Sequence, residues 1–179
     1  MTYQLIEFKE LSSQDLKLMY KWLNKDFVME WYSKKTYTID DINKKYFPII
    51  NKEKPIVGYI ILLNTNPIGY IQKYTIHDFE EDSACVNVNE KAATFDIFIG
   101  EKDYLHKGLG KYIIQKFLKE LIFVQCDIES CIIGCEITNF AASKAYNKVG
   151  FKQLKMIETS DVREYILKIG KEVFYKNKH

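Results

Sequence analysis

The first part of the chain carries one strand pattern and two helix patterns. Residues 3–9 alternate between apolar and polar side chains, which predicts a strand with one buried face. A cap at Ser12 is followed by apolar residues that recur at helical spacing through Leu23, and this pattern predicts the first helix. A second cap at Thr38 opens another helix, which we expect to stop near Pro48.

The middle of the chain reads as strands. Residues 56–63 and 68–76 are apolar runs that flank an Asn-Thr-Asn-Pro stretch with strong turn chemistry, so they predict a hairpin. Residues 77–91 are acidic and lose the periodicity, and we predict a surface loop there. Residues 94–99 read as a further strand.

The longest predicted helix covers residues 108–123. Its apolar residues form one continuous stripe, in which we place Tyr112 and Leu121. A stripe of this kind indicates a helix packed along one side against a core.

The remaining pattern completes a mixed fold. Residues 130–137 read as a buried strand, and Asn139 caps a helix that runs to Val149 and is closed by Gly150. Strands are predicted at 151–158 and 163–169. This order predicts an α/β (α+β mixed) protein with helices on both faces of one mixed sheet.

Composition narrows the class of protein. A chain of 179 residues with 47% hydrophobic residues suits one domain over residues 1–179. The formal net charge is only +2, with no concentrated basic stripe, which argues against nucleic acid as a partner. The first ten residues lack a signal-peptide pattern and no apolar run could span a bilayer, so we expect a cytoplasmic protein that does not bind membranes.

The four cysteines do not indicate a disulfide framework or a metal site. They stand at Cys85, Cys126, Cys131 and Cys135, and their gaps match no paired zinc-ligand spacing. The three histidines are scattered. We therefore expect reduced thiols and no metal.

A glycine-containing segment suggests an anion site. Residues 96–111 read as a strand, a loop and the start of the long helix, and the loop ends in Gly108-Leu109-Gly110. Backbone N–H groups at a helix start lack intrahelical partners and attract anions, and glycines let a pyrophosphate approach. The alternative is that the glycines only allow close packing of the helix.

A second segment decides between these readings by resemblance. Residues 139–151 read N-F-A-A-S-K-A-Y-N-K-V-G-F. Together with the glycine loop, they resemble the GCN5-related N-acetyltransferases (GNAT), which implies a central, mostly antiparallel twisted sheet and acetyl-CoA as cosubstrate. Leu105 departs from the family, which usually has Arg or Gln there. The resemblance implies these cofactor-binding residues: Phe98, Ile99, His106, Lys107, Gly108, Leu109, Gly110, Lys111, Asn139 and Ala142.

The resemblance extends to the aminoglycoside 6'-N-acetyltransferases over about residues 22–151. It rests on the Pro67-to-Tyr74 segment, on Trp22-Leu23 and Trp31-Tyr32 ahead of it, and on Asp96 placed twelve residues before Gly108. It implies an amine-acetylating enzyme of antibiotic resistance. The implied substrate-binding residues are Trp31, Tyr32, Gln72, Tyr74, Glu81, Asp82, Asp96 and Glu136.

One expected carboxylate is absent. The aminoglycoside enzymes often carry an Asp-Pro pair after the fifth strand, where this chain has Gly134-Cys135. Nearby Glu136 is the candidate replacement. This departure bears on the choice of drug more than on the reaction.

The implied catalytic residues are Asp96 and Tyr146. With an ordinary pKa of about 3.9, Asp96 is better suited to place the acceptor ammonium than to remove its proton outright. Tyr146, with an ordinary pKa of about 10, can protonate the departing thiolate. A backbone N–H in the 98–100 region is the candidate donor to the oxyanion, and acetyl transfer is direct, in a ternary complex.

Each assignment has a simpler alternative. Asp96 could be the outward member of an alternating strand, and Tyr146 could pack for its ring alone. Trp31 and Tyr32 could be core residues, and the acidic 78–82 segment could be a solvated surface.

The function also has alternatives. The acceptor could be a polyamine, a siderophore hydroxylamine or a protein amino terminus, and the chain could be a noncatalytic acetyl-CoA sensor. A monomer and a homodimer are both compatible with the sequence.

Overall fold

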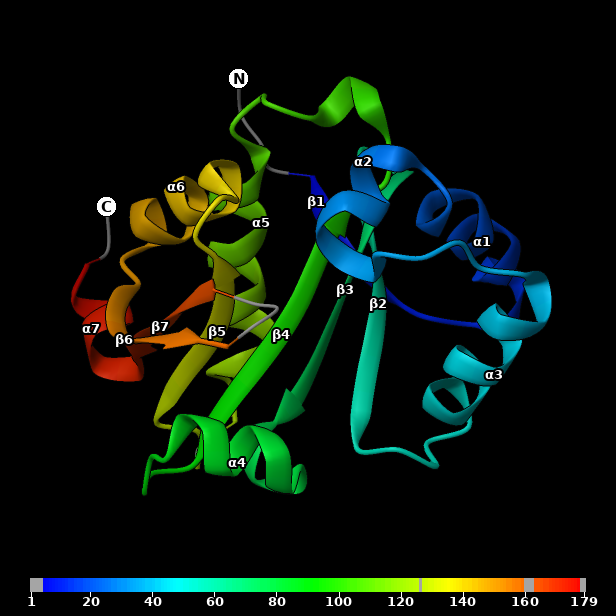
Figure 1. Cartoon of the computed structure of the whole chain (residues 1–179). Coiled ribbons are helices and arrows are strands. Elements are labelled where there is room, and N and C mark those ends of the chain that lie inside the picture. Colours follow the sequence, from blue (N-terminus) through cyan, green and yellow to red (C-terminus); the bar gives the residue numbers. More distant parts are fainter. Residues whose placement is uncertain (1–4, 126, 160–162, 178–179) are drawn as a thin grey trace. The chain divides into compact units, whose positions relative to one another are not determined.

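The strands form one mixed, mostly antiparallel sheet. The computed structural model describes residues 5–125, 127–159 and 163–177 (Figure 1). The strand order is β1-β2-β3-β4-β5-β7-β6. β4 pairs with β5 in parallel, whereas the β1–β2, β2–β3, β5–β7 and β6–β7 pairs are antiparallel. The strands are β1 Ile6–Glu10, β2 Ile56–Leu63, β3 Asn66–Thr75, β4 Ala92–Ile99, β5 Ser130–Glu136, β6 Lys152–Glu158 and β7 Arg163–Gly170.

Seven α-helices accompany these strands in the part of the chain that is described. They are α1 Leu16–Leu23, α2 Asp26–Val28, α3 Ile39–Ile50, α4 Glu80–Val86, α5 Leu109–Phe117, α6 Phe140–Val149 and α7 Lys171–Lys176. A π-helical turn, Met29–Ser33, follows α2, and another, Leu118–Ile122, continues α5.

The chain divides into two compact units that share strand β4. The first unit comprises Met1–Tyr74 and Asp96–Lys107, and the second comprises Thr75–Phe95 and Gly108–His179. The prediction of one domain is not tested by this division and stays a prediction.

The first unit packs α1 and α3 against β2 and β3. Its core includes Trp22, Tyr46 and Tyr70, all fully buried. The predicted hairpin is confirmed, with a two-residue turn in which Asn64 (φ 51°) and Thr65 (φ 66°) are both left-handed. That conformation matches the right-handed twist of the strands that the turn joins.

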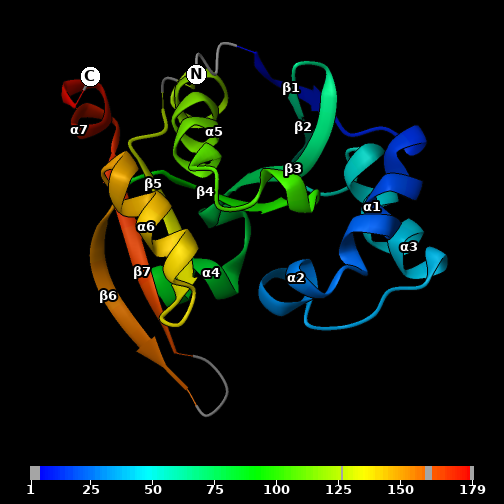
Figure 2. The same cartoon turned by 90° about the horizontal axis from the view of Figure 1, so that it is seen from above.

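The second unit has helices on both faces of its strands, as predicted. Figure 2 shows α5 and α6 side by side. On their face of the sheet, the ring of Phe95 contacts the rings of Phe117 and Tyr146. On the other face, Val86 of α4 packs with Ile132 and Ile166.

The segment predicted as a surface loop is instead partly helical. A 3-10 turn, Ile76–Asp78, leads into α4. The first turn of α4 contains three acidic residues, Glu80, Glu81 and Asp82. Their negative charges interact favourably with the positive end of the helix dipole. A seven-residue helix that buries mainly Val86 is too short to show an apolar period.

Two smaller predictions were also wrong in part. The α3 helix continues two residues beyond Pro48, to Ile50. Tyr112 is exposed rather than part of the buried α5 stripe, which instead uses Ile114. Helix α7 was not predicted.

The predicted helix caps are present, and a few predicted residues lie outside the described ranges. The caps at Ser12, Thr38 and Asn139 are present. Residues 3 and 4 of the first predicted strand and Cys126 lie outside the described residues. No helix in the described ranges is long and apolar enough to cross a membrane.

Candidate active site

Asp96 lies at the end of a buried hydrogen-bond chain in the first unit. The Tyr70 hydroxyl donates to Oε1 of Gln72 at 2.8 Å, and Nε2 of Gln72 donates to Oδ2 of Asp96 at 2.7 Å. Tyr70 and Gln72 are two residues apart on β3 and therefore share a face of the strand. Gly58 of β2 leaves room for Tyr70, because a Cβ there would lie 2.4 Å from the hydroxyl oxygen.

This chain of hydrogen bonds bears on two sequence predictions. Gln72 is buried and uses both ends of its amide on Tyr70 and Asp96, so the structure gives it a place as a support for Asp96. Because the Asp96 carboxylate only accepts, it fixes Nε2 of Gln72 toward itself, and the Tyr70 hydroxyl then donates to Oε1. One oxygen of the carboxylate is thus hydrogen-bonded inside the protein.

Two tyrosines, Tyr32 and Tyr46, lie where the charge of Asp96 affects their pKa values. The ring of Tyr32 lies 4.8 Å from that of Phe98, edge to face, and packs against the core of this unit. Burial raises the pKa of Tyr32 well above its ordinary value, and the negative charge of Asp96 adds to that shift. Burial also raises the pKa of Tyr46, while the neighbouring Tyr32 hydroxyl lowers it, and the buried Tyr46 hydroxyl makes no hydrogen bond of good geometry among the described residues.

The other substrate residues predicted in this unit are less enclosed. Trp31 is exposed on the π-helical turn after α2, and Tyr74 is partly buried near the end of β3. Tyr32 and Trp31 therefore differ, since Tyr32 packs against the core and Trp31 does not.

The end of β4 is anchored by Glu101. Burial raises the pKa of Glu101, but hydrogen bonds from Lys21, Trp22 and Lys25 outweigh it and lower the pKa to about 2. Lys25 also donates to the carbonyl of Gly100 at 2.8 Å. These contacts fix the strand end that follows Asp96.

One predicted oxyanion donor is already in use. The N–H of Gly100 donates to the carbonyl of Ile68 at 2.8 Å, so Gly100 is wrong as a candidate. The side chain of Phe98 is buried in aromatic contacts, which leaves its backbone as the relevant part. The backbones of Phe98 and Ile99 stay as the predicted donors.

The glycine loop has the backbone form that an anion site requires. His106 (φ 59°) and Gly108 (φ 75°) are left-handed, and Gly108 is the N-cap of α5. A Cβ at Gly108 would meet nothing within 4 Å, so the space beside the helix start is open. His106 and Lys107 are exposed in the loop.

The two glycines have different surroundings. A Cβ at Gly110 would lie 3.3 Å from Cβ of Ala145, so this glycine allows α5 to approach α6 closely. Gly108 has no such neighbour. The close-packing alternative therefore fits Gly110, whereas Gly108 is accounted for by its left-handed backbone, and the anion site there stays a prediction. Leu109 is buried, and Nζ of Lys111 lies 5.8 Å from the ring centroid of Tyr112.

Asn139 caps α6. Its side-chain oxygen accepts a hydrogen bond from the N–H of Ala142 at 3.1 Å. Of its two predicted roles, a cofactor contact or a helix cap, the structure displays the cap. Ala142 accordingly has its N–H engaged.

Tyr146 lies on α6 with its ring packed among aromatic side chains. The ring centroids of Phe151 and Phe95 lie 5.8 and 6.1 Å away, both edge to face. The residue is 6% exposed. This packing holds the ring in place, which agrees with the alternative that Tyr146 packs for its ring alone. A proton donor also needs a ring held in place, so the packing does not decide between the two roles.

Acidic residues in the second unit fall into two groups. Glu81 and Asp82 lie in the first turn of α4. Glu136 ends β5 and pairs with Glu164 of β7, and Oε2 of Glu164 lies 2.9 Å from the position of a Cβ on Gly134. A carboxylate from β7 thus occupies the space that a side chain at position 134 would fill.

Two buried cysteines, Cys131 and Cys135, have raised pKa values. Burial raises the pKa of Cys131, and burial together with the charges of Glu164 and Glu136 raises that of Cys135 to about 11. Thiols with raised pKa values are poor nucleophiles. Among the described residues, no group of three or more His, Cys, Asp and Glu side chains could hold a metal ion.

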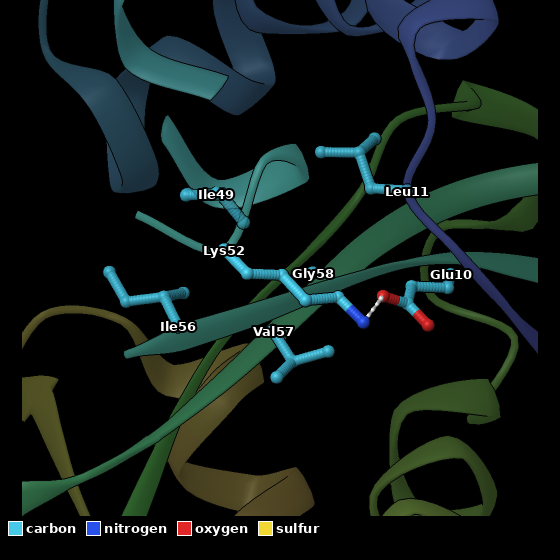
Figure 3. Close-up of a pocket in the computed structure, with 7 residues that line it drawn as sticks. All are labelled: Glu10, Leu11, Ile49, Lys52, Ile56, Val57 and Gly58. Atoms are coloured by element: carbon cyan, nitrogen blue, oxygen red, sulfur yellow. Dashed lines mark ion pairs between the residues drawn. The ribbon is translucent and has the colours of Figure 1, made fainter. Parts of the chain in front are cut away.

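A small pocket in the first unit contains none of the predicted site residues (Figure 3). Its volume is about 260 Å³, and an ion pair of 3.6 Å joins Nζ of Lys52 to Oε1 of Glu10 at its side. The lining residues are Glu10, Leu11, Ile49, Lys52, Ile56, Val57 and Gly58.

Sequence reasoning missed three residues near Asp96: Lys45, Tyr46 and Tyr70. The alternation of Tyr70 with Gln72 along β3 could have indicated that they share a face. Lys45 and Tyr46 lie on α3, far from Asp96 in sequence, and no local pattern signals their position.

Comparison with known proteins adds family information. A family model described as "Acetyltransferase (GNAT) domain" matches residues 12–159. Aminoglycoside N(6')-acetyltransferase type 1 of Klebsiella pneumoniae is 25% identical over 158 residues, covering 87% of this chain and 78% of that protein.

Two solved structures share the fold. A structure of AAC(6')-Ib in complex with paromomycin and acetyl-CoA has a TM-score of 0.84 and 24% identity, with 98% of each chain covered. Spermidine N-acetyltransferase from Vibrio cholerae, in complex with CoA and spermine, has a TM-score of 0.77 and 17% identity, covering 96% of this chain and 99% of that chain.

Proposed function

Because the chain belongs to the GNAT acetyltransferase family, we propose that it transfers the acetyl group of acetyl-CoA to the 6'-amine of an aminoglycoside. The observation that carries the proposal is the buried Tyr70–Gln72–Asp96 chain, which holds one carboxylate in a fixed orientation for an ammonium. The similarity to aminoglycoside N(6')-acetyltransferases supports this acceptor. The product, an amide, no longer carries the positive charge of the amine.

The cofactor is assigned to the loop and helix start around Gly108. Backbone N–H groups of the first turn of α5 would receive the pyrophosphate, with positive charge from His106, Lys107 and Lys111 nearby in sequence. The open space at Gly108 supports this assignment. Acetyl-CoA supplies the thioester that the amine attacks.

The chain's own residues then carry the proton steps. Asp96 orients the acceptor amine, which must be uncharged to attack. The C–N bond forms to give a tetrahedral oxyanion, which a backbone N–H of Phe98 or Ile99 stabilises, and the attacking nitrogen releases its surplus proton to Asp96, directly or through water. The C–S bond then breaks, and the hydroxyl of Tyr146 gives its proton to the departing thiolate. Exchange with solvent returns Asp96 and Tyr146 to their starting states, and no covalent enzyme intermediate is required.

We assign the carboxylate that the sequence lacks at position 134 to Glu164. Its position over Gly134 supports this assignment better than sequence adjacency supports Glu136. Carboxylates here and on α4, where Glu81 and Asp82 lie, would attract the further amines of a polycation. Cytoplasmic location and a monomeric or homodimeric state stay predictions.

The test is acetyl-CoA consumption with release of free thiol across a panel of acceptors. Turnover of drugs with a 6'-amine, but not of matched analogues with a 6'-hydroxyl, is the expected result. Turnover of spermidine or peptides alone would refute the aminoglycoside as acceptor and leave the acetyltransferase reaction in place.

Two variants test the catalytic assignments. Asp96→Asn should lower kcat about a hundredfold or more while acetyl-CoA binding stays unchanged. Tyr146→Phe keeps the aromatic packing, so its stability and acetyl-CoA affinity should match the wild type while turnover falls by a similar factor. Full activity in either variant would remove the role assigned to that residue.

A further inference from the structure

Lys45 on α3 holds its ammonium inside a box of three tyrosine rings. Its Nζ lies 5.1 Å from the ring centroid of Tyr32 and 5.4 Å from those of Tyr37 and Tyr46. All three distances fall within the range of cation–π attraction, about 6 Å. Lys45 is partly buried, whereas its neighbour Lys44 is exposed.

The negative charge of Asp96 affects the pKa of Lys45. Burial lowers the pKa of Lys45, Asp96 opposes that shift, and the positive charges of Lys35 and Lys54 add to it. Asp96 likewise contributes to the raised pKa of Tyr32. Geometry links the two groups: the Tyr32 ring, 5.1 Å from Nζ of Lys45, lies 4.8 Å from the ring of Phe98, which shares a face of β4 with Asp96.

The remaining titratable groups at this place are tyrosines. Tyr46 and Tyr70 have pKa values raised first by burial, and the charge of Asp96 adds to both shifts. Tyr37 accepts a hydrogen bond from Lys45 at 3.4 Å. Tyr46 and Tyr70 are therefore neutral at physiological pH, and the charges that act on Lys45 are those of Asp96, Lys35 and Lys54.

We propose that Lys45 favours the uncharged, nucleophilic form of the acceptor amine bound at Asp96. The proposal rests on the proposed function, because it takes Asp96 as the carboxylate that receives the amine. A fixed cation in partly buried surroundings disfavours a second cation more than a neutral amine. The acceptor ammonium therefore loses its proton to water at a lower pH, and the neutral amine attacks the thioester.

The experiment separates charge from packing at position 45. Lys45→Met removes the charge and keeps an unbranched apolar stem. We expect its KM for the acceptor to fall and its kcat to fall, each on the order of tenfold, since the protonated amine is no longer repelled. The rising limb of its kcat–pH profile should move to higher pH by about one unit.

Two matched variants complete the design. Lys45→Arg keeps the charge and should restore the wild-type pH profile. Lys44→Met removes an exposed charge from the same helix and should leave KM, kcat and the pH profile unchanged. Thermal unfolding of each variant checks folding, and Lys45→Gln replaces Lys45→Met if the latter does not fold.

Three results would overturn the proposal. They are an unchanged pH profile in Lys45→Met, a fall in kcat without a fall in KM, and an Arg variant as defective as the Met variant. The profile is measured with whichever amine of the acceptor panel the wild type acetylates, so failure of the aminoglycosides refutes the proposed acceptor without deciding the role of Lys45. If the wild type acetylates no amine, calorimetric binding of kanamycin decides, and equal affinity in wild type and Lys45→Met overturns the proposal.

Discussion

The buried contact between Tyr70 and Gln72 yields a quantitative prediction. Tyr70 is fully buried and Gln72 is 7% exposed, and their hydrogen bond is 2.8 Å long. Gln72→Leu leaves the Tyr70 hydroxyl buried without its acceptor, and Tyr70→Phe leaves Oε1 of Gln72 without its donor. An orphaned buried polar group costs about 1–3 kcal/mol, so each single change should lower the free energy of unfolding by roughly 2 kcal/mol.

The double variant distinguishes this reasoning from simple loss of packing. With both partners removed, neither group is orphaned, so the double variant should be about 1–2 kcal/mol more stable than the sum of the single effects predicts. Urea denaturation followed by circular dichroism measures all four proteins. Gln14→Leu, at an exposed position, controls for the change of residue type. Strictly additive losses would refute the hydrogen-bonded coupling.

The same cycle has a catalytic readout. Gln72→Leu and the double variant both remove the N–H that Asp96 receives from Gln72. Both should lose kcat on the order of tenfold, with acetyl-CoA affinity unchanged, because a misplaced carboxylate no longer orients the amine. A double variant that regained stability and also full activity would show that Asp96 needs no support from Gln72.

Three further predictions concern the first unit. Gly100→Ala should lower the free energy of unfolding by about 2 kcal/mol or more, measured by urea denaturation, since its Cβ would lie 2.3 Å from the buried ring of Trp22. The Glu101 pKa is lowered from 4.5 to about 2, so its contribution, roughly 1–2 kcal/mol, is present above pH 4.5 and lost as the pH falls toward 2; the stability gap between wild type and Glu101→Gln should close over that range. Tyr46→Phe should change the free energy of unfolding by less than about 1 kcal/mol, because the buried Tyr46 hydroxyl meets the Tyr32 hydroxyl in a geometry too poor for a full hydrogen bond, and a loss of about 2 kcal/mol would contradict this.

Several elements could be predicted because their signals are local. The capping box at Thr38 involves residues three apart, and the Asn64-Thr65 turn and the cap of α6 by Asn139 are equally short in range. Helix α4 was missed because its stability depends on Val86 meeting β5 and β7, which no short window of sequence contains.

The candidate site divides in the same way. The glycine loop and the α6 motif could be recognised as segments, and Asp96 by its spacing from Gly108. By contrast, the hydrogen bond from Gln72 to Asp96 was not predicted, and the role of Gln72 in binding substrate stays a prediction. Alternation along β3 could have placed Tyr70 on the same face as Gln72, but the contact between Gln72 and Asp96 of β4 became visible only in the folded structure.

The sequence by itself determined the family, the cosubstrate expected from it, and the elements that short-range caps, turns and apolar periods specify. The tertiary structure decided which side chains share a volume: the tyrosine box around Lys45, the support of Asp96 by Gln72, and the Glu164 carboxylate over Gly134. The physical reason is that burial, charge interaction and hydrogen bonding depend on distance in space, which residues far apart in the chain acquire only through packing.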